Sequence, residues 1–219
     1  MADSDVSGPG ESARVRELEQ EVQTLRQEAE RLREENRRWA KLAGTDGLSG
    51  LPNRISFFRA FLPQALQQSV KEGLPVGLIL FSPDSLGEVN ESFGREAGDE
   101  VVKGLGTLIQ SLVGDSGKLG HVDGANFIQM IYPGDIQLTR GRANMVRARV
   151  RTHEFPCAGS VAQITVSAGI LSSEPTEGSD FRSLGEEYFR QLNEALHSAK
   201  KAGGNRVEVA GTDQTTQRN

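Results

Sequence analysis

The side chains best suited to redox or metal chemistry are scarce in this chain of 219 residues. Cys157 is the only cysteine, so no disulfide can form within one chain. We expect its thiol to be a small buried hydrophobe, with a redox role as the alternative. His121 is expected on the surface of a hairpin, and His153 and His197 suggest no chemistry. These residue types predict neither a metal centre nor a cofactor.

The remaining polar residues of interest surround Asp123-Gly124, a turn between two apolar segments that is typical of a β-hairpin. Apolar periodicity predicts the elements that hold this hairpin. Helices are expected near 54–70 (with a kink at Pro63), 86–93, 97–113, 139–152 and 181–202, and strands at 76–82, 118–122, 127–132, 162–171 and 206–209. Strands that alternate with helices and are interrupted by one hairpin predict an α/β fold, a mixed sheet flanked by helices.

Three stretches of this region resemble the diguanylate cyclase (GGDEF) family. Residues Asp46–Arg54, DGLSGLPNR, are similar to the family's D-x-L-T-G-L-P-N-R segment. Residues Thr165–Ile170, TVSAGI, are similar to T-V-S-x-G-V, and Ala195–Val207, ALHSAKKAGGNRV, to A-L-Y-x-A-K-x-x-G-R-N-R-V. The resemblance implies a GGDEF-like domain. The family joins two GTP molecules into cyclic di-GMP across two facing domains, with metal ions neutralising the phosphates.

The segment that should spell the catalytic hairpin reads Asp123-Gly124-Ala125-Asn126-Phe127, so only its second glycine and its phenylalanine match. The resemblance places the two metal-binding carboxylates at Ser82 and Ala125, where neither residue can supply one. It places a catalytic acid at Asn126. Asp123 replaces a glycine and adds bulk and negative charge where phosphates approach. We therefore expect no catalytic residues and no metal site.

Other losses agree with this expectation. A phosphate-facing lysine of the family is replaced by Gly87, and an arginine by Gly204. The inhibitory product site, R-x-x-D, reads Gly114-Asp-Ser-Gly117. Both the active site and the product-feedback site are therefore expected to be depleted.

Some positions survive. Asn90 and Asp99 match guanine-contacting residues of the family, and Lys200 matches a phosphate-contacting lysine. The alternative explanation is structural, with Asn90 capping a turn and Asp99 capping a helix. Asp84 matches a second acid of the family and could form a relocated metal site with Asp123.

An apolar repeat with alternating gaps of three and four residues precedes this domain and predicts a coiled coil. Positions a hold Val15, Val22, Ala29 and Asn36, and positions d hold Leu18, Leu25, Leu32 and Trp39. β-Branched residues at a with leucine at d favour a parallel dimer, and an asparagine at a fixes one register. The alternative is a single solvated helix.

The flanking charges also fit a parallel homodimer. Each g residue would meet the e residue five positions on in the partner helix, and the pairs are opposite in charge: Arg14 with Glu19, Glu21 with Arg26, and Glu28 with Arg33. Such exposed pairs are weak but set orientation.

The net charge of −5 and the pI of about 5.4 argue against nucleic acid as the main partner. The sequence contains no apolar run that could span a membrane and no signal peptide, so we expect a cytoplasmic protein. The predicted organisation is a disordered tail over 1–12, a coiled coil over 13–43, a degenerate GGDEF domain over 44–209 and a second disordered tail over 210–219.

The combined prediction is a non-catalytic, dimeric adaptor or regulator in bacterial signalling or localisation, which acts on an unidentified protein partner. The contact surface is expected on the coiled coil or the domain surface next to it rather than in the former cleft. The alternative is a receptor that binds GTP or cyclic di-GMP, weakly if at all, through Asn90, Asp99 and Lys200. A cyclase with a displaced active site is the third hypothesis.

Overall fold

The computed structural model describes residues 18–32, 35, 44–114 and 117–211. The chain divides into two compact units, which are Met1–Gly44 and Thr45–Asn219. Among the described residues, no helix combines the length and apolar character needed to cross a membrane.

Residues 18–32 of the first unit form a helix. Four apolar side chains at the predicted core positions are uncovered in the single chain, with exposures of 44% for Leu18, 45% for Val22, 57% for Leu25 and 46% for Leu32. Val15, Asn36 and Trp39 lie outside the described residues. The helix fits a coiled-coil helix, and the dimer itself stays a prediction.

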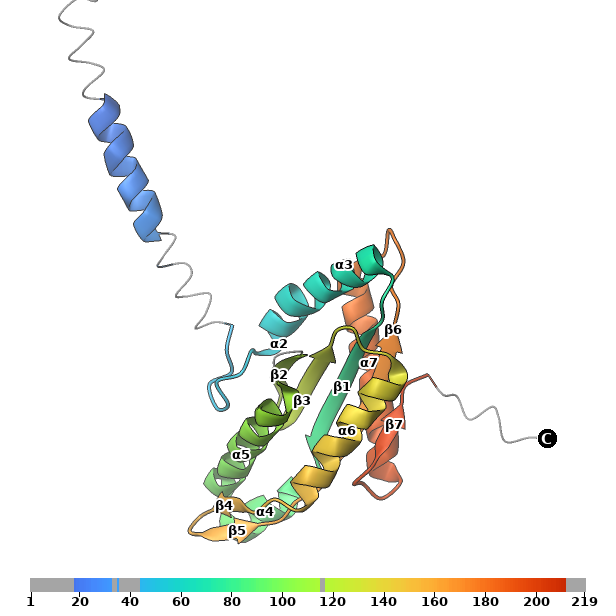
Figure 1. Cartoon of the computed structure of the whole chain (residues 1–219). Helices are drawn as coiled ribbons and strands as arrows, with labels where there is room; N and C mark the ends of the chain where they lie inside the picture. The colour runs from blue at the N-terminus through green and yellow to red at the C-terminus, as the bar shows by residue number, and fades with distance from the viewer. Residues whose placement is uncertain (1–17, 33–34, 36–43, 115–116, 212–219) are drawn as a thin grey trace, which may run out of the picture. The chain divides into compact units, whose positions relative to one another are not determined.

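The second unit is built on a mixed sheet with the strand order β2-β3-β1-β6-β7 (Figure 1). These strands are β1 (Val76–Pro83), β2 (Gly117–Asp123), β3 (Asn126–Ile131), β6 (Val166–Ser173) and β7 (Val207–Val209). Only β6 and β7 pair in parallel. All residues of β1 are buried, because helices cover both faces of the central strand.

One face of the sheet packs against α5 (Arg95–Val113) and α6 (Ile136–Arg151), and α4 (Leu86–Phe93) adjoins α5. The other face packs against α3 (Leu62–Glu72) and α7 (Phe181–Lys201). Alternate residues of β1 divide between the two cores: Ile79 and Phe81 enter the first, and Leu78 and Leu80 the second. The observed architecture is the predicted α/β fold, with a helix layer on each side of a mixed sheet (Figure 1).

Two predicted elements differ in detail. The expected helix near 54–70 is divided into α2 (Arg54–Ser56), a π-helical turn η1 (Phe57–Phe61) and α3. Pro63 lies at the start of α3, where its missing N–H removes a helical hydrogen bond, and the wider turn precedes it.

The expected strand over 162–171 is divided as well. Its first residue, Ala162, ends β5 (Ser160–Ala162), which pairs with β4 (Phe155–Cys157) in a small separate hairpin, and the main strand β6 begins only at Val166. Cys157 is buried in that hairpin, as predicted.

Candidate functional site

At the position near the end of β1 that the family resemblance assigns to a metal-binding carboxylate, a serine is hydrogen-bonded to a lysine. Ser82 is buried, and the Lys200 ammonium donates to its hydroxyl oxygen at 2.7 Å and to the Pro83 carbonyl at 3.2 Å. Lys200 lies in the last turn of α7, which packs against β1 and β6. A cation therefore lies where the family resemblance places a metal-binding carboxylate.

Asp84, the acid that follows this position, is engaged inside the protein. Its carboxylate accepts hydrogen bonds from the Thr165 hydroxyl at 2.6 Å, the Ser167 hydroxyl at 2.6 Å and the Asn205 backbone N–H at 2.9 Å. A side chain at Gly204 would come within 3.0 Å of the same carboxyl group. These bonds tie β1 to β6 and to the loop after α7, so Asp84 has a structural role.

The hairpin between β2 and β3 carries the other degenerate positions. Asp123 pairs with Asn126 in the strand register, so the turn residues are Gly124 and Ala125, one residue later than predicted. Gly124 has a positive φ of 47°, which glycine adopts without strain. The Asn126 amide donates to the Asp123 carboxylate, and Arg54 lies 3.9 Å from the same carboxyl group.

This chemistry does not fit a magnesium ion. Ser82 and Ala125 provide no carboxylate, the Asp84 carboxylate is used in hydrogen bonds, and the Lys200 ammonium would repel a cation beside Ser82. Among the described residues, no group of three or more histidine, cysteine, aspartate or glutamate side chains is arranged to hold a metal. The donor set at the family's metal position thus disagrees with the ion that the family uses.

Asn90 and Asp99 lie on neighbouring helices and neither side chain is a cap. Helix α5 begins at Arg95 with Gly94 as its N-cap, so Asp99 is inside the helix and the capping explanation is wrong for it. Asn90 lies inside α4; its carbonyl, not its side chain, accepts the N–H of Gly94 at 2.9 Å.

The Asn90 amide is held against α5 at Gly98. A Cβ at Gly98 would meet the Asn90 side-chain oxygen at 1.8 Å, so only glycine allows this approach. Asp99, the next residue, is exposed. The Asn90 side chain therefore lies beside the residue that precedes Asp99, whereas Lys200 is bonded to Ser82.

His121 differs from its sequence prediction, because it is 5% exposed rather than on the surface. Its Nδ1 lies 2.6 Å from the Asp46 carboxylate, its Nε2 lies 2.8 Å from the Gly124 carbonyl, and its ring stacks on Phe127 at 4.6 Å. The sequence shows no signal for this contact, because 75 positions separate His121 from Asp46.

Asp46 fixes the turn that begins the domain. Burial raises the pKa of Asp46, but hydrogen bonds from the Ser49 backbone N–H and hydroxyl and from His121 lower it by more, so the pKa lies below 3.8. The ionised carboxylate thus connects the Asp46–Arg54 turn to the hairpin.

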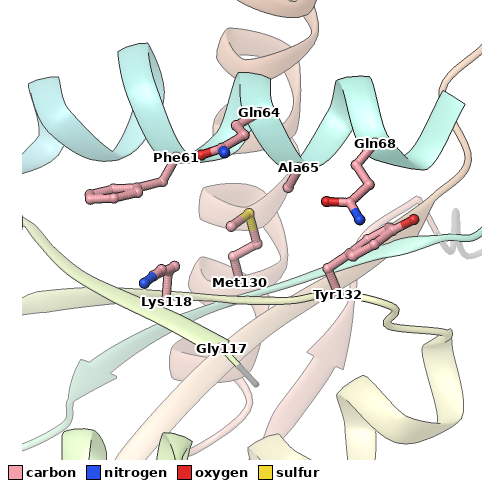
Figure 2. Close-up of a pocket in the computed structure, with 8 residues that line it drawn as sticks. All are labelled: Phe61, Gln64, Ala65, Gln68, Gly117, Lys118, Met130 and Tyr132. Atoms are coloured by element: carbon pink, nitrogen blue, oxygen red, sulfur yellow. The ribbon is translucent and has the colours of Figure 1, made fainter. Parts of the chain in front are cut away.

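The position of the family's product-feedback motif borders a small hollow between α3 and the β2–β3 edge of the sheet. Figure 2 shows Phe61, Gln64 and Gln68 from the helical side facing Lys118 of β2, Met130 of β3 and Tyr132, which follows β3. Gly117 lies at its edge with no side chain to contribute (Figure 2). The acid of the feedback motif is therefore missing from this hollow.

Residues 43–206 match the family described as "Diguanylate cyclase, GGDEF domain". The chain belongs to the GGDEF family. The diguanylate cyclase DgcP of Pseudomonas aeruginosa is 31% identical over 170 residues, which are 76% of this chain and 24% of that protein. A diguanylate cyclase of Vibrio cholerae is 29% identical over 166 residues, with coverage of 76% and 49%. The matched region thus spans about a quarter of the first relative and about half of the second.

Solved structures agree with the fold. The coiled coil and GGDEF domain of DgcB from Caulobacter crescentus, in complex with c-di-GMP, aligns with a TM-score of 0.73 at 25% identity, covering 88% of this chain and 99% of that one. The diguanylate cyclase SiaD of Pseudomonas aeruginosa, in complex with its activator SiaC, aligns with a TM-score of 0.70 at 21% identity, covering 91% and 74%. Because SiaD is only 21% identical to this chain, the similarity to its structure supports the fold alone.

Proposed function

We propose that this GGDEF protein is non-catalytic and acts as a dimeric adaptor or regulator in bacterial signalling or localisation by binding another protein. The observation that carries the proposal is the Lys200 ammonium bonded to the Ser82 hydroxyl at 2.7 Å. A metal-binding carboxylate at this position would attract a metal ion, whereas here the ammonium group of Lys200 lies beside the Ser82 hydroxyl.

The hairpin supports the same conclusion. Ala125 carries no side-chain oxygen, and the Asn126 amide is bonded to Asp123 rather than free to act as an acid. An amide neither ionises nor releases a proton as a carboxyl group does. Metal-dependent phosphoryl transfer depends on metal ions to neutralise developing charge, so the joint loss of these groups argues against the family reaction.

The dimer is supported by the uncovered apolar row on the helix over 18–32. In the DgcB structure, a coiled coil accompanies a GGDEF domain. Two copies of a domain held by a coiled coil present two copies of any binding surface, and such avidity can exceed a single weak contact by about a hundredfold.

A second candidate function, a receptor for GTP or cyclic di-GMP, rests on one specific observation. The Asn90 amide is held against Gly98, next to Asp99, and neither side chain caps a helix. Capping therefore does not explain why asparagine and aspartate occupy these two positions. Against this candidate, Lys200 is bonded to Ser82, and Asp123 places a negative charge near the hairpin.

Titration separates the two candidates. GTP and cyclic di-GMP are titrated calorimetrically into the full chain with and without magnesium, and into a variant with Asn90→Ala and Asp99→Ala. The adaptor proposal expects no saturable heat from either nucleotide. Micromolar binding that the double variant abolishes, in a protein that remains folded, would favour the receptor.

A further inference from the structure

A second hollow lies on the other side of η1, where α2 and η1 face the first half of α7. Its volume is about 200 Å³, which is close to the size of one large side chain and below the usual size of a drug-like ligand site. The apolar residues that line it, called its floor below, are Ile55, Phe58 and Phe189. Ile55 is 60% exposed, an unusual exposure for a large aliphatic side chain.

The shape of the hollow depends on a glycine inside α7. Gly185 is buried, and a Cβ there would lie 3.3 Å from Leu62 and 3.4 Å from Phe58. Phe58 and Phe189 meet edge to face at 5.3 Å and close the floor. Glycine inside a helix lowers helix stability, so this close approach explains the residue in physical terms.

Three of the residues that line the hollow are cationic, namely Arg54, Arg59 and Arg182. The Arg54 guanidinium lies 4.0 Å from the centre of the Phe189 ring, so stacking holds this cation in place before any ligand arrives. A guanidinium that is already positioned loses less conformational entropy when it binds a carboxylate.

Glu186 is the one acid among the lining residues, and Asp123, which is outside the lining, lies 3.9 Å from Arg54. Glu186 lies 3.6 Å from Arg182, and both side chains are largely exposed, so this ion pair is weak and replaceable. The hollow thus carries a local positive charge on a chain whose net charge is −5.

We propose that this hollow binds an acidic peptide segment of a protein partner, with one aromatic side chain on the apolar floor and flanking carboxylates on Arg59 and Arg182. Arginine pairs with carboxylates through parallel hydrogen bonds, and aromatic anchors in small pockets typically dominate such contacts. The inference rests on the proposed protein-binding function and assigns a surface to it. Peptide binding is measured independently of cyclase activity.

The probe is a short synthetic peptide with glutamates on both sides of one phenylalanine, carrying a fluorescent label and followed by anisotropy on the full chain. Variants of the peptide replace the phenylalanine with alanine or the glutamates with glutamine. We expect saturable binding of the first peptide that weakens with salt, and loss of most of it with either variant.

Matched protein variants locate the contact. The double variant Arg59→Glu and Arg182→Glu should weaken binding roughly tenfold or more, whereas Arg140→Glu, on the exposed surface of α6, should leave it within about twofold. Glu186→Gln should strengthen binding, because it removes the only competing carboxylate among the residues that line the hollow. A gain of affinity cannot come from a folding defect.

Three results would overturn the proposal: no saturable binding of the peptide, an equal loss with Arg140→Glu, or binding of a thymidine oligonucleotide in place of the peptide. The last would indicate a phosphate-binding surface on which bases stack. If the peptide does not bind and the protein forms no cyclic di-GMP, the proposed peptide surface is wrong, but the proposed adaptor function is not contradicted. Formation of cyclic di-GMP from GTP would contradict the non-catalytic adaptor function, whether or not the peptide binds.

Discussion

At the scale of single residues, two side chains that match positions of the family pattern make structural contacts in this protein. Lys200 is bonded to Ser82, and Asp84 is bonded to Thr165, Ser167 and Asn205. Both contacts join α7 and its following loop to the central strands. The Lys200 and Asp84 side chains are thus part of the packing between α7, its following loop and the sheet.

Restoring the two metal positions should not restore catalysis. We expect the double variant Ser82→Asp and Ala125→Asp to form no cyclic di-GMP from GTP with magnesium or manganese. Lys200 would pair with the new carboxylate at position 82, and Gly87, Gly204 and Asp123 still disfavour a triphosphate. The measurement is product formation by chromatography, and product above background would show that the metal carboxylates alone were missing.

The contact between His121 and Asp46 predicts a stability that depends on pH. The His121 Nδ1 lies 2.6 Å from the Asp46 carboxylate, which also accepts hydrogen bonds from Ser49. Asp46 has a pKa below 3.8 in the folded protein, so its contribution is fully present above that pH and is lost as the pH falls through the folded pKa.

The variant Asp46→Asn tests this contribution. We expect it to lower the free energy of unfolding by about 1–3 kcal/mol near pH 6, with a difference from wild type that shrinks below pH 3.8. Urea unfolding at several pH values measures both. Asp99→Asn, at an exposed carboxyl group on α5, is the control. A constant difference at every pH would contradict the role of the ionised carboxylate.

At the scale of elements, the sequence predicts most of the domain because its strands are buried on both faces and its helices are amphipathic. The run at Val76–Pro83 and the periodicity of α5 and α7 are therefore visible without coordinates. The sequence does not predict the π-turn before Pro63 or the β4–β5 hairpin, because each depends on local hydrogen bonding rather than on a repeated pattern.

The candidate site was only partly predictable. The loss of carboxylates is visible in the sequence, but the partners that replace them are not. Lys200 is 118 residues from Ser82, and the buried state of His121 depends on a contact with Asp46 that forms only in the folded chain. The helix start at Arg95, which excludes Asp99 as a cap, follows from the positive φ of Gly94, 87°.

The packing of α7 on β6 provides a prediction at this scale. A Cβ at Gly169 would lie 2.3 Å from the Leu192 carbonyl oxygen and 2.8 Å from the Leu196 nitrogen, both backbone atoms of α7. We expect Gly169→Ala to lower the free energy of unfolding by more than about 3 kcal/mol, because the whole helix must move.

The matched control for that variant is Gly87→Ala. Gly87 has open space around its Cβ direction and lies in α4, so alanine there should be neutral or stabilising by up to about 1 kcal/mol. Chemical denaturation measures both variants. If Gly169→Ala were as stable as Gly87→Ala, the close packing of α7 on the sheet would be wrong.

At the scale of the whole molecule, we predict that assembly depends on the N-terminal helix. We expect the full chain to be a dimer by light scattering at micromolar concentration, because Leu18 and Leu25 lie on its uncovered apolar row. The variant Leu18→Glu with Leu25→Glu should be a monomer, since charges replace two core positions. Gln23→Glu, off this row, should stay dimeric. A wild-type monomer would rule out the coiled coil.

We propose that this protein retains the GGDEF fold without the reaction of the family. The most direct test incubates the purified full chain with GTP and magnesium or manganese and measures cyclic di-GMP by chromatography, beside an active diguanylate cyclase as the positive control. With Lys200 bonded to Ser82 and no carboxylate at position 125, the predicted result is no product above background. Steady formation of cyclic di-GMP by the wild-type chain would contradict it.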